Sequence, residues 1–330
     1  MTQIEKLIKK ACNNALSGKI LSRDDIIALL DLNPDSAEVE KLGAAAREAA
    51  AELTGNHGRV WSAIGVDFAP CPVNCDFCSF GEKWGVTKDA YELTTDEIID
   101  LAAKLLHEGA KWLTLRTTEY YSLQKLAATA KKMRSAIAGN YKIVANTGEL
   151  DRETADLLTS GGIQIIYHSL RLREEINTGI PVKNRLETLA AVKNSPLELA
   201  FLVEPVGTEH TSAEIADVFL TAMRYNASLT GAMARVPVPG TPLGNIPAVS
   251  ERRLAQIAAV TRLAAGRNAP DICIHPPSQQ ALEWGANVVV VEVGAIPRDT
   301  CNTKQEWQNF DINTAITWFN QAGYKLDRGV

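Results

Sequence analysis

Residues 1–56 contain three successive segments in which apolar residues recur at helical spacing. These segments are IEKLIKKACNNAL, DDIIALLDL and AEVEKLGAAAREAAAELTG. Ser22 precedes the second segment as an N-cap, and acidic residues follow it in the first turn. The alanine-rich third segment ends at Gly55, and glycine commonly terminates helices. We therefore expect a helical extension over residues 1–56.

From residue 60 onward the pattern changes to apolar, strand-like runs that alternate with helix-like segments. Several of these runs are continuously apolar, which is typical of parallel strands buried on both faces. The predicted strands cover residues 60–68, 111–117, 141–147, 163–169, 197–204, 230–238, 270–276 and 286–293. Eight repeats predict an α/β fold, namely a closed (β/α)8 barrel of the TIM type with a closing C-terminal helix. An open doubly wound sheet is the alternative, but no GxGxxG motif follows the first strand.

Composition narrows the class of protein. The 330 residues are 46% hydrophobic and 22% charged, as in ordinary globular proteins, and no linker or low-complexity segment interrupts them. We expect one barrel domain over residues 57–330 beside the extension at 1–56.

The net charge of −5 gives no reason to expect nucleic acid or an anionic membrane as a partner. No apolar run has the length of a membrane span or the features of a signal peptide, so we expect a cytoplasmic protein.

Three of the six cysteines lie within eight residues, in the segment FAPCPVNCDFCSFGEKWG. Cys71, Cys75 and Cys78 have C-x3-C-x2-C spacing and follow the first predicted strand, at the end of a barrel that carries the chemistry. In a reducing compartment such crowding indicates metal binding instead of disulfides. Structural zinc sites usually have four ligands, often as two pairs, and no second pair is present. Short spacing lets one loop give three thiolates to an iron–sulfur cluster, which leaves one iron open.

This motif, followed by an aromatic residue on the loop after the first strand, resembles the radical S-adenosylmethionine (SAM) superfamily. The segment CPVNCDFCSF is most similar to the branch that contains biotin synthase, the hydrogenase maturase HydE and methylornithine synthase. The resemblance implies that Cys71, Cys75 and Cys78 hold a [4Fe–4S] cluster whose open iron binds the amino and carboxylate groups of SAM. It also implies reductive cleavage of SAM to a 5′-deoxyadenosyl radical, which abstracts hydrogen from the substrate.

The same resemblance assigns SAM contacts to residues at the ends of the second to fourth strands. Phe77 takes the place of the aromatic residue that shields the cluster or lies near adenine. Thr118 and Glu119 stand where the branch has a Gly-Glu pair for the SAM amino group, and the missing glycine is a departure from the pattern. Arg185 falls where the branch places an arginine on the SAM carboxylate. Alternatively, Glu119 is a solvated loop acid, and Arg185 is an exposed arginine paired with Glu187 or Glu174.

Further contacts are implied at the predicted mouth of the barrel. His168 and Ser169 end the fourth predicted strand and Arg171 follows it, where the family places ribose or substrate contacts, although a lone histidine is often a packed residue. Glu204 ends the fifth strand near the mouth. Val238 lies in RVPVPGTPL, which resembles the segment whose backbone meets adenine. Glu149 is either a SAM or substrate contact or an acid at the start of a helix.

The remaining cysteines bear on the type of reaction. Biotin synthase holds a second cluster on cysteines of its inner strands, and the corresponding strands WLTLRT, IVANT and ELAFLVE contain none. Cys273 on the seventh strand and Cys301 after the eighth are candidates for a second cluster, for substrate binding or for no chemical role. Cys12 is expected to be a packed core residue.

Two functional classes follow from these observations. The first is a radical SAM enzyme of cofactor biosynthesis that acts on a small molecule or cofactor precursor through a rearrangement or a C–C or C–S bond reaction. Sulfur insertion with a second cluster is the alternative within this class. Either enzyme needs a low-potential electron donor such as ferredoxin or flavodoxin. The second class is a non-catalytic iron–sulfur assembly or electron-transfer protein.

Overall fold

A computed structural model of the chain describes residues 1–294 and 309–330, and its centre is a closed parallel barrel. Neighbouring strands pair in chain order around the barrel, and β10 pairs with β1 to close it, with Arg59 opposite Val288 and Gly65 opposite Gly294. The barrel strands are β1 (His57–Gly65), β4 (Ala110–Arg116), β5 (Lys142–Asn146), β6 (Ile165–Tyr167), β7 (Glu198–Val206), β8 (Leu229–Ala234), β9 (Asp271–His275) and β10 (Val288–Gly294). The prediction of a TIM-type (β/α)8 barrel is therefore confirmed.

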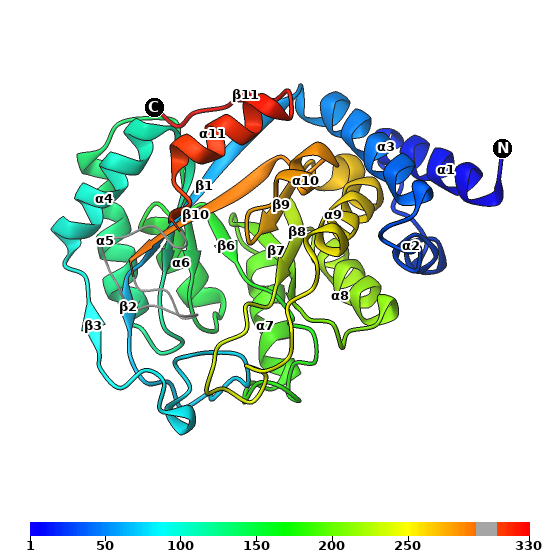
Figure 1. The fold of residues 1–330 in the computed structure, drawn as a ribbon. Coiled ribbons are helices and arrows are strands. Elements are labelled where there is room, and N and C mark those ends of the chain that lie inside the picture. The colour runs from blue at the N-terminus through cyan, green and yellow to red at the C-terminus, as the bar shows by residue number, and fades with distance from the viewer. Residues whose placement is uncertain (295–308) are drawn as a thin grey trace.

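Helices surround this barrel on its outer face (Figure 1). Several begin at the residues that favour helix initiation, as at Thr94 and Thr211, where the threonine side chain and the glutamate three residues later form a capping box. The surrounding helices are α4 (Thr95–Glu108), α5 (Leu123–Ala136), α6 (Arg152–Ser160), α7 (Val182–Lys193), α8 (Ser212–Arg224), α9 (Glu251–Ala265) and α10 (Gln279–Glu283).

The N-terminal helices form a second layer beside the barrel. They are α1 (Gln3–Ser17), α2 (Arg23–Leu30) and α3 (Ala37–Thr54). Both α1 and α3 pack on α9, whose inner side contacts β8 and β9, so residues 254–265 of α9 are all buried. The predicted caps are confirmed, since the Ser22 side chain accepts the Asp25 N–H and Gly55 has a left-handed φ of 60°. The division of the chain between residues 56 and 57 stays a prediction.

The C-terminal helix α11 (Ile312–Gln321) and strand β11 (Lys325–Leu326) lie at the amino end of the barrel. There β11 pairs with His57 and Gly58 at the start of β1. Figure 1 shows the loops after β2 (cyan) and after β8 (yellow) together at the opposite end. The closing helix and the cysteine loop therefore occupy opposite ends of the barrel.

Three strands end two or more residues earlier than predicted at the carboxyl end of the barrel. The strand predicted over 60–68 ends at Gly65, and β2 (Asp67–Phe68) instead pairs antiparallel with β3 (Tyr91–Glu92) outside the barrel. The strand predicted over 163–169 is confined to β6. The strand predicted over 230–238 ends at Ala234, since Pro237 and Pro239 have no N–H for sheet pairing.

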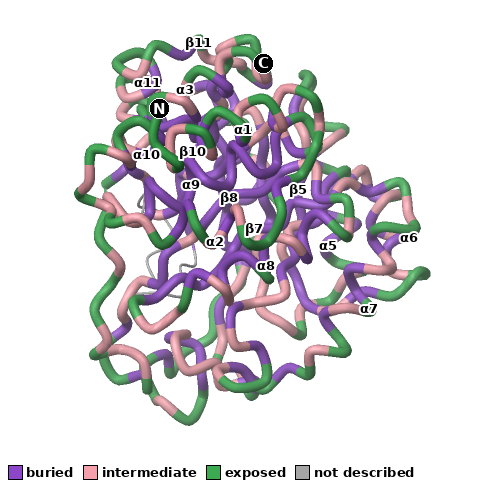
Figure 2. The backbone as a smooth tube through the Cα atoms, turned by 90° about the vertical axis from the view of Figure 1, so that its right-hand side faces the viewer, coloured by how far each residue is buried: buried purple, intermediate pink, exposed green. Residues whose placement is uncertain are grey.

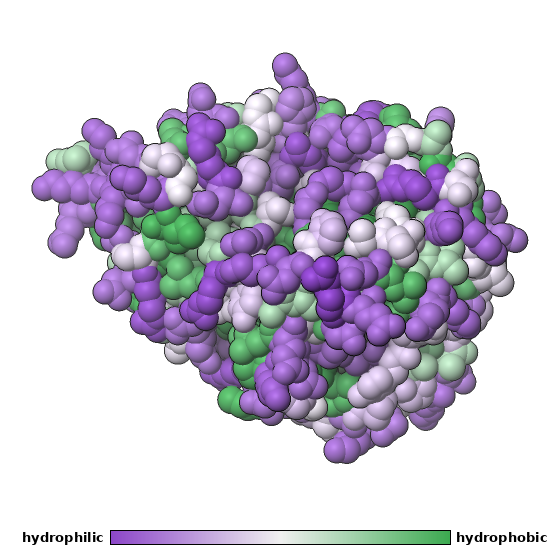
Figure 3. Space-filling view, turned by 180° about the vertical axis from the view of Figure 1, so that it is seen from behind, coloured by the Kyte–Doolittle hydropathy of each residue, from purple (hydrophilic) through white to green (hydrophobic). Residues whose placement is uncertain are grey.

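Figure 2 shows that burial is concentrated along β7, β8 and α9. The interior of the barrel contains a cluster of apolar side chains that includes Trp61, Trp112 and Leu229. On the face seen in Figure 3, hydrophobic side chains form small groups separated by hydrophilic ones. Within residues 1–294 and 309–330, no helix has the length and apolar character that crossing a membrane requires.

Candidate active site

The three clustered cysteines lie on one tight loop that follows β2. The Cys71 N–H donates to the Phe80 carbonyl at 2.6 Å, and the Cys78 N–H donates to the Cys75 carbonyl at 3.0 Å. Cys71 and Cys78 pack against the stacked rings of Phe68 and Phe80, whose centroids are 6.3 Å apart. The loop therefore holds its thiols half-buried beside an aromatic wall.

Two other loops form backbone hydrogen bonds with the cysteine loop at Asp76. The Asp76 N–H donates to the Asn177 carbonyl at 2.9 Å, and the Leu243 N–H donates to the Asp76 carbonyl at 3.0 Å. A Cβ atom at Gly179 would lie 2.6 Å from the Val73 carbonyl oxygen, so only glycine permits this close approach. The loops after β6 and β8 thus fix the backbone that carries the cysteines.

The chemistry of this donor set fits an iron–sulfur cluster. Burial raises the pKa of Cys75 to about 12 and also raises the pKa of Cys71. Without a metal these thiols are therefore protonated at neutral pH, and iron binding would replace the protons with positive charge. Three thiol groups on one half-buried loop are the ligands that iron–sulfur clusters take in proteins.

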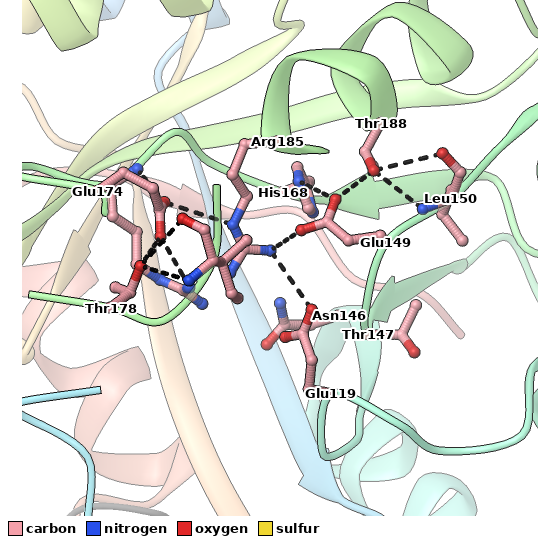
Figure 4. Close-up of polar contacts among 12 residues, drawn as sticks. Glu119, Asn146, Thr147, Glu149, Leu150, His168, Glu174, Thr178, Arg185 and Thr188 are labelled. Carbon is pink, nitrogen blue, oxygen red and sulfur yellow. Dashed lines mark hydrogen bonds and ion pairs between the residues drawn. The ribbon is translucent and has the colours of Figure 1, made fainter. Parts of the chain in front are cut away.

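Arg185 of α7 is the centre of a buried cluster of charges beside this loop (Figure 4). Its Nη1 atom lies 2.8 Å from Glu149 Oε1 and 3.8 Å from Glu119 Oε1. Its Nε atom lies 3.3 Å from Glu174 Oε2. Arg185 is only 2% exposed, which excludes the alternative of an exposed helix arginine. Its Nη2 atom is buried and has no hydrogen-bond partner among residues 1–294 and 309–330.

Glycine permits the loop contact that brings two of these carboxylates together. A Cβ atom at Gly148 would overlap the backbone oxygen of Glu119. The β4–α5 loop therefore lies directly on the β5–α6 loop, and Glu119 and Glu149 both face Arg185. Burial, together with Glu149 and Glu174, raises the pKa of Glu119 against the opposing effect of Arg185.

Thr188 and His168 surround the Glu149 carboxylate on its other side. The Thr188 hydroxyl donates to Glu149 Oε2 and accepts the Leu150 N–H at 2.9 Å. His168 Nε2 lies 3.5 Å from Glu149 Oε2, and burial lowers the pKa of His168 well below its usual value. The imidazole is therefore neutral, and the charge of Glu149 is directed toward Arg185.

A cavity extends from the cysteine loop into the barrel. Its empty volume, including the open mouth, is about 990 Å³. Phe77 and Cys78 line the mouth, and Arg171 and Glu204 line the wall, with Arg171 Nε 3.7 Å from Glu204 Oε1. The Tyr167 hydroxyl donates to Glu204. Phe77 and Glu204 thus occupy the region that the sequence indicated.

Of the three side chains expected at the mouth after the fourth strand, only Arg171 is among those that line the cavity. The Ser169 hydroxyl accepts the Leu202 N–H at 3.1 Å, and His168 packs behind Glu149. Thr118 is also engaged within the protein, because its N–H donates to Asp67 Oδ1 at 2.8 Å. The expectation that His168 and Ser169 point into the mouth is therefore corrected.

The remaining predicted residues are Val238, Cys273 and Cys301. Val238 is buried, and its carbonyl accepts the Thr241 hydroxyl at 2.8 Å, so its role toward adenine stays a prediction. Cys273 is fully buried in the barrel interior among Trp61, Leu229 and other apolar residues. Burial raises the pKa of the Cys273 thiol well above its ordinary value. Cys301 lies outside the described residues.

The sequence reasoning missed several charged residues of the site. Asp67 holds Thr118, while Arg116 and Glu292 line the cavity as an ion pair with Nη1 and Oε1 2.9 Å apart. A charged residue at the carboxyl end of an otherwise apolar barrel strand is the signal that would have indicated Arg116 and Glu292.

Comparison with known proteins shows which proteins the chain is similar to. Residues 68–221 match the radical SAM superfamily. A biotin synthase of Persephonella marina (strain DSM 14350 / EX-H1) is 24% identical over 274 residues, which cover 79% of each chain. A biotin synthase of Parafrankia sp. (strain EAN1pec) is 25% identical over 289 residues, which cover 83% of this chain and 78% of the relative.

Solved structures share the fold. The crystal structure of methylornithine synthase (PylB) is similar, with a TM-score of 0.78 and 19% identity, over 96% of this chain and 97% of that chain. HydG, a maturase of the [FeFe]-hydrogenase, has a TM-score of 0.79 and 14% identity over 98% of this chain and 76% of its own. At these identities the likeness concerns the barrel and its helices.

Proposed function

We propose that this chain is a radical SAM enzyme similar to biotin synthase, in which Cys71, Cys75 and Cys78 hold a [4Fe–4S] cluster that binds and cleaves SAM. When bound, the reduced cluster supplies the electron for cleavage, and the 5′-deoxyadenosyl group supplies the radical that abstracts hydrogen from a small substrate. The protein residues bind the two ligands, orient them and exclude water.

The charge cluster around Arg185 is the observation that carries this proposal. Three carboxylates, from Glu119, Glu149 and Glu174, surround one guanidinium. SAM carries an ammonium, a sulfonium and a carboxylate, so it has a net positive charge. The guanidinium suits the SAM carboxylate, and the surplus of carboxylates suits the two cationic groups. In this arrangement Glu119 and Glu149 contact the ammonium, and Phe77 lies near the adenine or shields the cluster.

The reaction that we propose uses a single cluster. Sulfur insertion, which the names of the biotin synthase relatives suggest, would need a second cluster or another source of sulfur. Cys273 lies among apolar side chains and is completely buried. We therefore favour a rearrangement or a C–C or C–S bond reaction on a small molecule or cofactor precursor.

The electron donor and compartment complete the proposal. A low-potential ferredoxin or flavodoxin would reduce the cluster, because the cluster loop is only half-buried and its edge is accessible from the surface. A reducing cytoplasm would preserve the thiols and the cluster.

Anaerobic reconstitution tests the proposal. Iron and sulfide are counted per chain, and dithionite and SAM are then added while 5′-deoxyadenosine is measured by mass spectrometry. About four irons per chain and formation of 5′-deoxyadenosine are expected for one cluster. About eight irons would favour sulfur insertion. A protein that binds no iron, or that binds iron without cleaving SAM, would contradict the proposal.

A further inference from the structure

The cavity beside the cysteine loop has a wall in which opposite charges alternate. Arg116 of β4 and Glu292 of β10 form one ion pair, with Nη1 and Oε1 2.9 Å apart. Both side chains are largely withdrawn from solvent, at 12% and 5% exposure. His275 of β9 also lies near Glu292, with Nε2 3.5 Å from Oε2. Arg171 and Glu204 form a second, longer pair.

Among the residues that the structure describes, these two ion pairs bring equal numbers of positive and negative charges to the wall. Arg235 also lines the cavity, but its Nη2 atom lies 3.0 Å from Glu209 Oε2 and is neutralised there. A phosphate ester placed between the two pairs would meet the carboxylates of Glu204 and Glu292, and a polyamine would meet the guanidinium groups. A ligand that carries one charge of each sign meets a complementary partner for both.

The spacing of the first pair favours a particular kind of zwitterion. In an α-amino acid the ammonium and carboxylate groups are attached to the same carbon atom, so both charges lie side by side. Arg116 and Glu292 also present their charges side by side, in contact with each other. A ligand ammonium at Glu292 and a ligand carboxylate at Arg116 would therefore replace one ion pair with two.

The floor below these charges is apolar and partly aromatic. Trp61, Tyr167, Leu202, Met233 and Val290 line it. The Trp61 and Tyr167 rings meet edge to face, with centroids 5.5 Å apart. Since the Trp61 N–H donates to Thr114, this ring presents its apolar surface to the cavity. An aliphatic or aromatic side chain would bury apolar area here.

We infer that the substrate is an α-amino acid with an aliphatic or aromatic side chain. Its carboxylate pairs with Arg116, its ammonium pairs with Glu292, and its side chain extends toward Trp61. This inference rests on the proposed function for the position of the chemistry, because Cys78 and Phe77 line the mouth of the same cavity.

The test uses the reconstituted enzyme with SAM and dithionite. Each of the standard L-amino acids is added in turn, and 5′-deoxyadenosine formation is compared with the rate without addition. At least one aliphatic or aromatic amino acid is expected to raise the rate at least about tenfold, because a bound substrate couples SAM cleavage to turnover. Its N-acetyl derivative lacks the cation and its amide lacks the anion, so each derivative is expected to lose the stimulation.

Variants and binding give independent readouts. Binding of the same labelled amino acid to the unreduced, SAM-loaded enzyme is measured by equilibrium dialysis. Glu292→Gln is expected to weaken it by about 30-fold or more, as for loss of a buried charge partner. Arg23→Gln is the matched control, since Arg23 pairs with Asp217 on the outer surface. Equal stimulation by the N-acetyl derivative or the amide, or no stimulation and no binding by any amino acid, would overturn the inference.

The two proposals fail in different ways. SAM cleavage that no amino acid stimulates, with no amino acid bound, leaves the proposed function in place and contradicts the substrate class. Amino acid binding that depends on Glu292, in a protein that never forms 5′-deoxyadenosine, supports the substrate class and contradicts the proposed function.

Discussion

Arg185 Nη1 lies 2.8 Å from Glu149 Oε1, and this ion pair joins α7 to the loop that follows β5. Glu119 and Glu174 approach the same guanidinium from two further loops. The pair therefore lies at the meeting point of three connections at the carboxyl end of the barrel, beside the cysteine loop. Its geometry leads to specific expectations for SAM binding.

Replacement of Arg185 with glutamine is expected to weaken SAM binding at least about 30-fold. The change removes the cation that would face the SAM carboxylate in the proposed site, and loss of one partner from a buried charge pair costs about 2–5 kcal/mol. Equilibrium dialysis of SAM against the unreduced, reconstituted enzyme measures the effect. Arg152→Gln is the control, because Arg152 forms an exposed pair with Asp156 within α6. Unchanged SAM affinity in Arg185→Gln would exclude the proposed contact.

Thr188 is expected to act as a positioning residue for Glu149. Thr188→Val removes the hydroxyl that donates to Glu149 and accepts the Leu150 N–H. We expect SAM affinity to fall by roughly 5- to 30-fold, corresponding to about 1–2 kcal/mol for an unsatisfied buried polar group. Thr188→Ser keeps the hydroxyl and should restore the affinity. If serine and valine behave alike, Thr188 contributes only to packing.

SAM affinity is expected to fall as the pH is lowered through the raised pKa of Glu119. Burial raises this pKa, so the free carboxyl takes up a proton at a higher pH than an ordinary glutamate does. The SAM ammonium favours the ionised carboxylate, and binding must therefore release that proton at low pH. The dissociation constant, measured from about pH 5 to about pH 8, should rise toward acid and level off above the pKa. Glu119→Gln should remove this part of the pH dependence, and an identical profile in that variant would contradict the assignment.

Cys75→Ala is expected to lose most of the iron and the brown colour after reconstitution. In the proposed site three thiolates bind the cluster, and removal of one would leave a second iron without a protein ligand. Cys12→Ala is the matched control, because Cys12 lies in α1 with its Sγ atom 3.9 Å from the Ala45 carbonyl. Iron, sulfide and absorbance measurements on both variants check the prediction. Full iron content in Cys75→Ala would show that the cluster is held elsewhere.

Arg262→Met is expected to destabilise the fold without changing the site. Arg262 of α9 is completely buried, and it donates to the Gly285 carbonyl at 2.8 Å and to Asn287 Oδ1 at 2.6 Å. Burial lowers the pKa of Arg262 to about 10, so the guanidinium stays charged at neutral pH. Loss of these donors should cost about 3–5 kcal/mol, measured by urea denaturation. Arg152→Met should have little effect, and equal stability of the two variants would contradict the prediction.

The local elements of this protein are determined by spacing along the chain. Helical periodicity and caps such as Ser22 and Gly55 indicated the N-terminal helices, because these signals act within a few residues. Continuous apolar runs indicated parallel strands, and their number indicated the barrel. The spacing of Cys71, Cys75 and Cys78 predicted an iron–sulfur cluster, because a single loop could provide all three thiol ligands.

The charge networks were decided only by the tertiary structure. Glu119, Glu149 and Glu174 occupy separate loops, and no local pattern shows that they share Arg185. Arg116 and Glu292 are 176 residues apart and meet because β10 closes the barrel against β1, which in turn pairs with β4. Strand register and barrel closure depend on side-chain packing along the whole chain, so long-range ion pairs emerge only once the fold is complete.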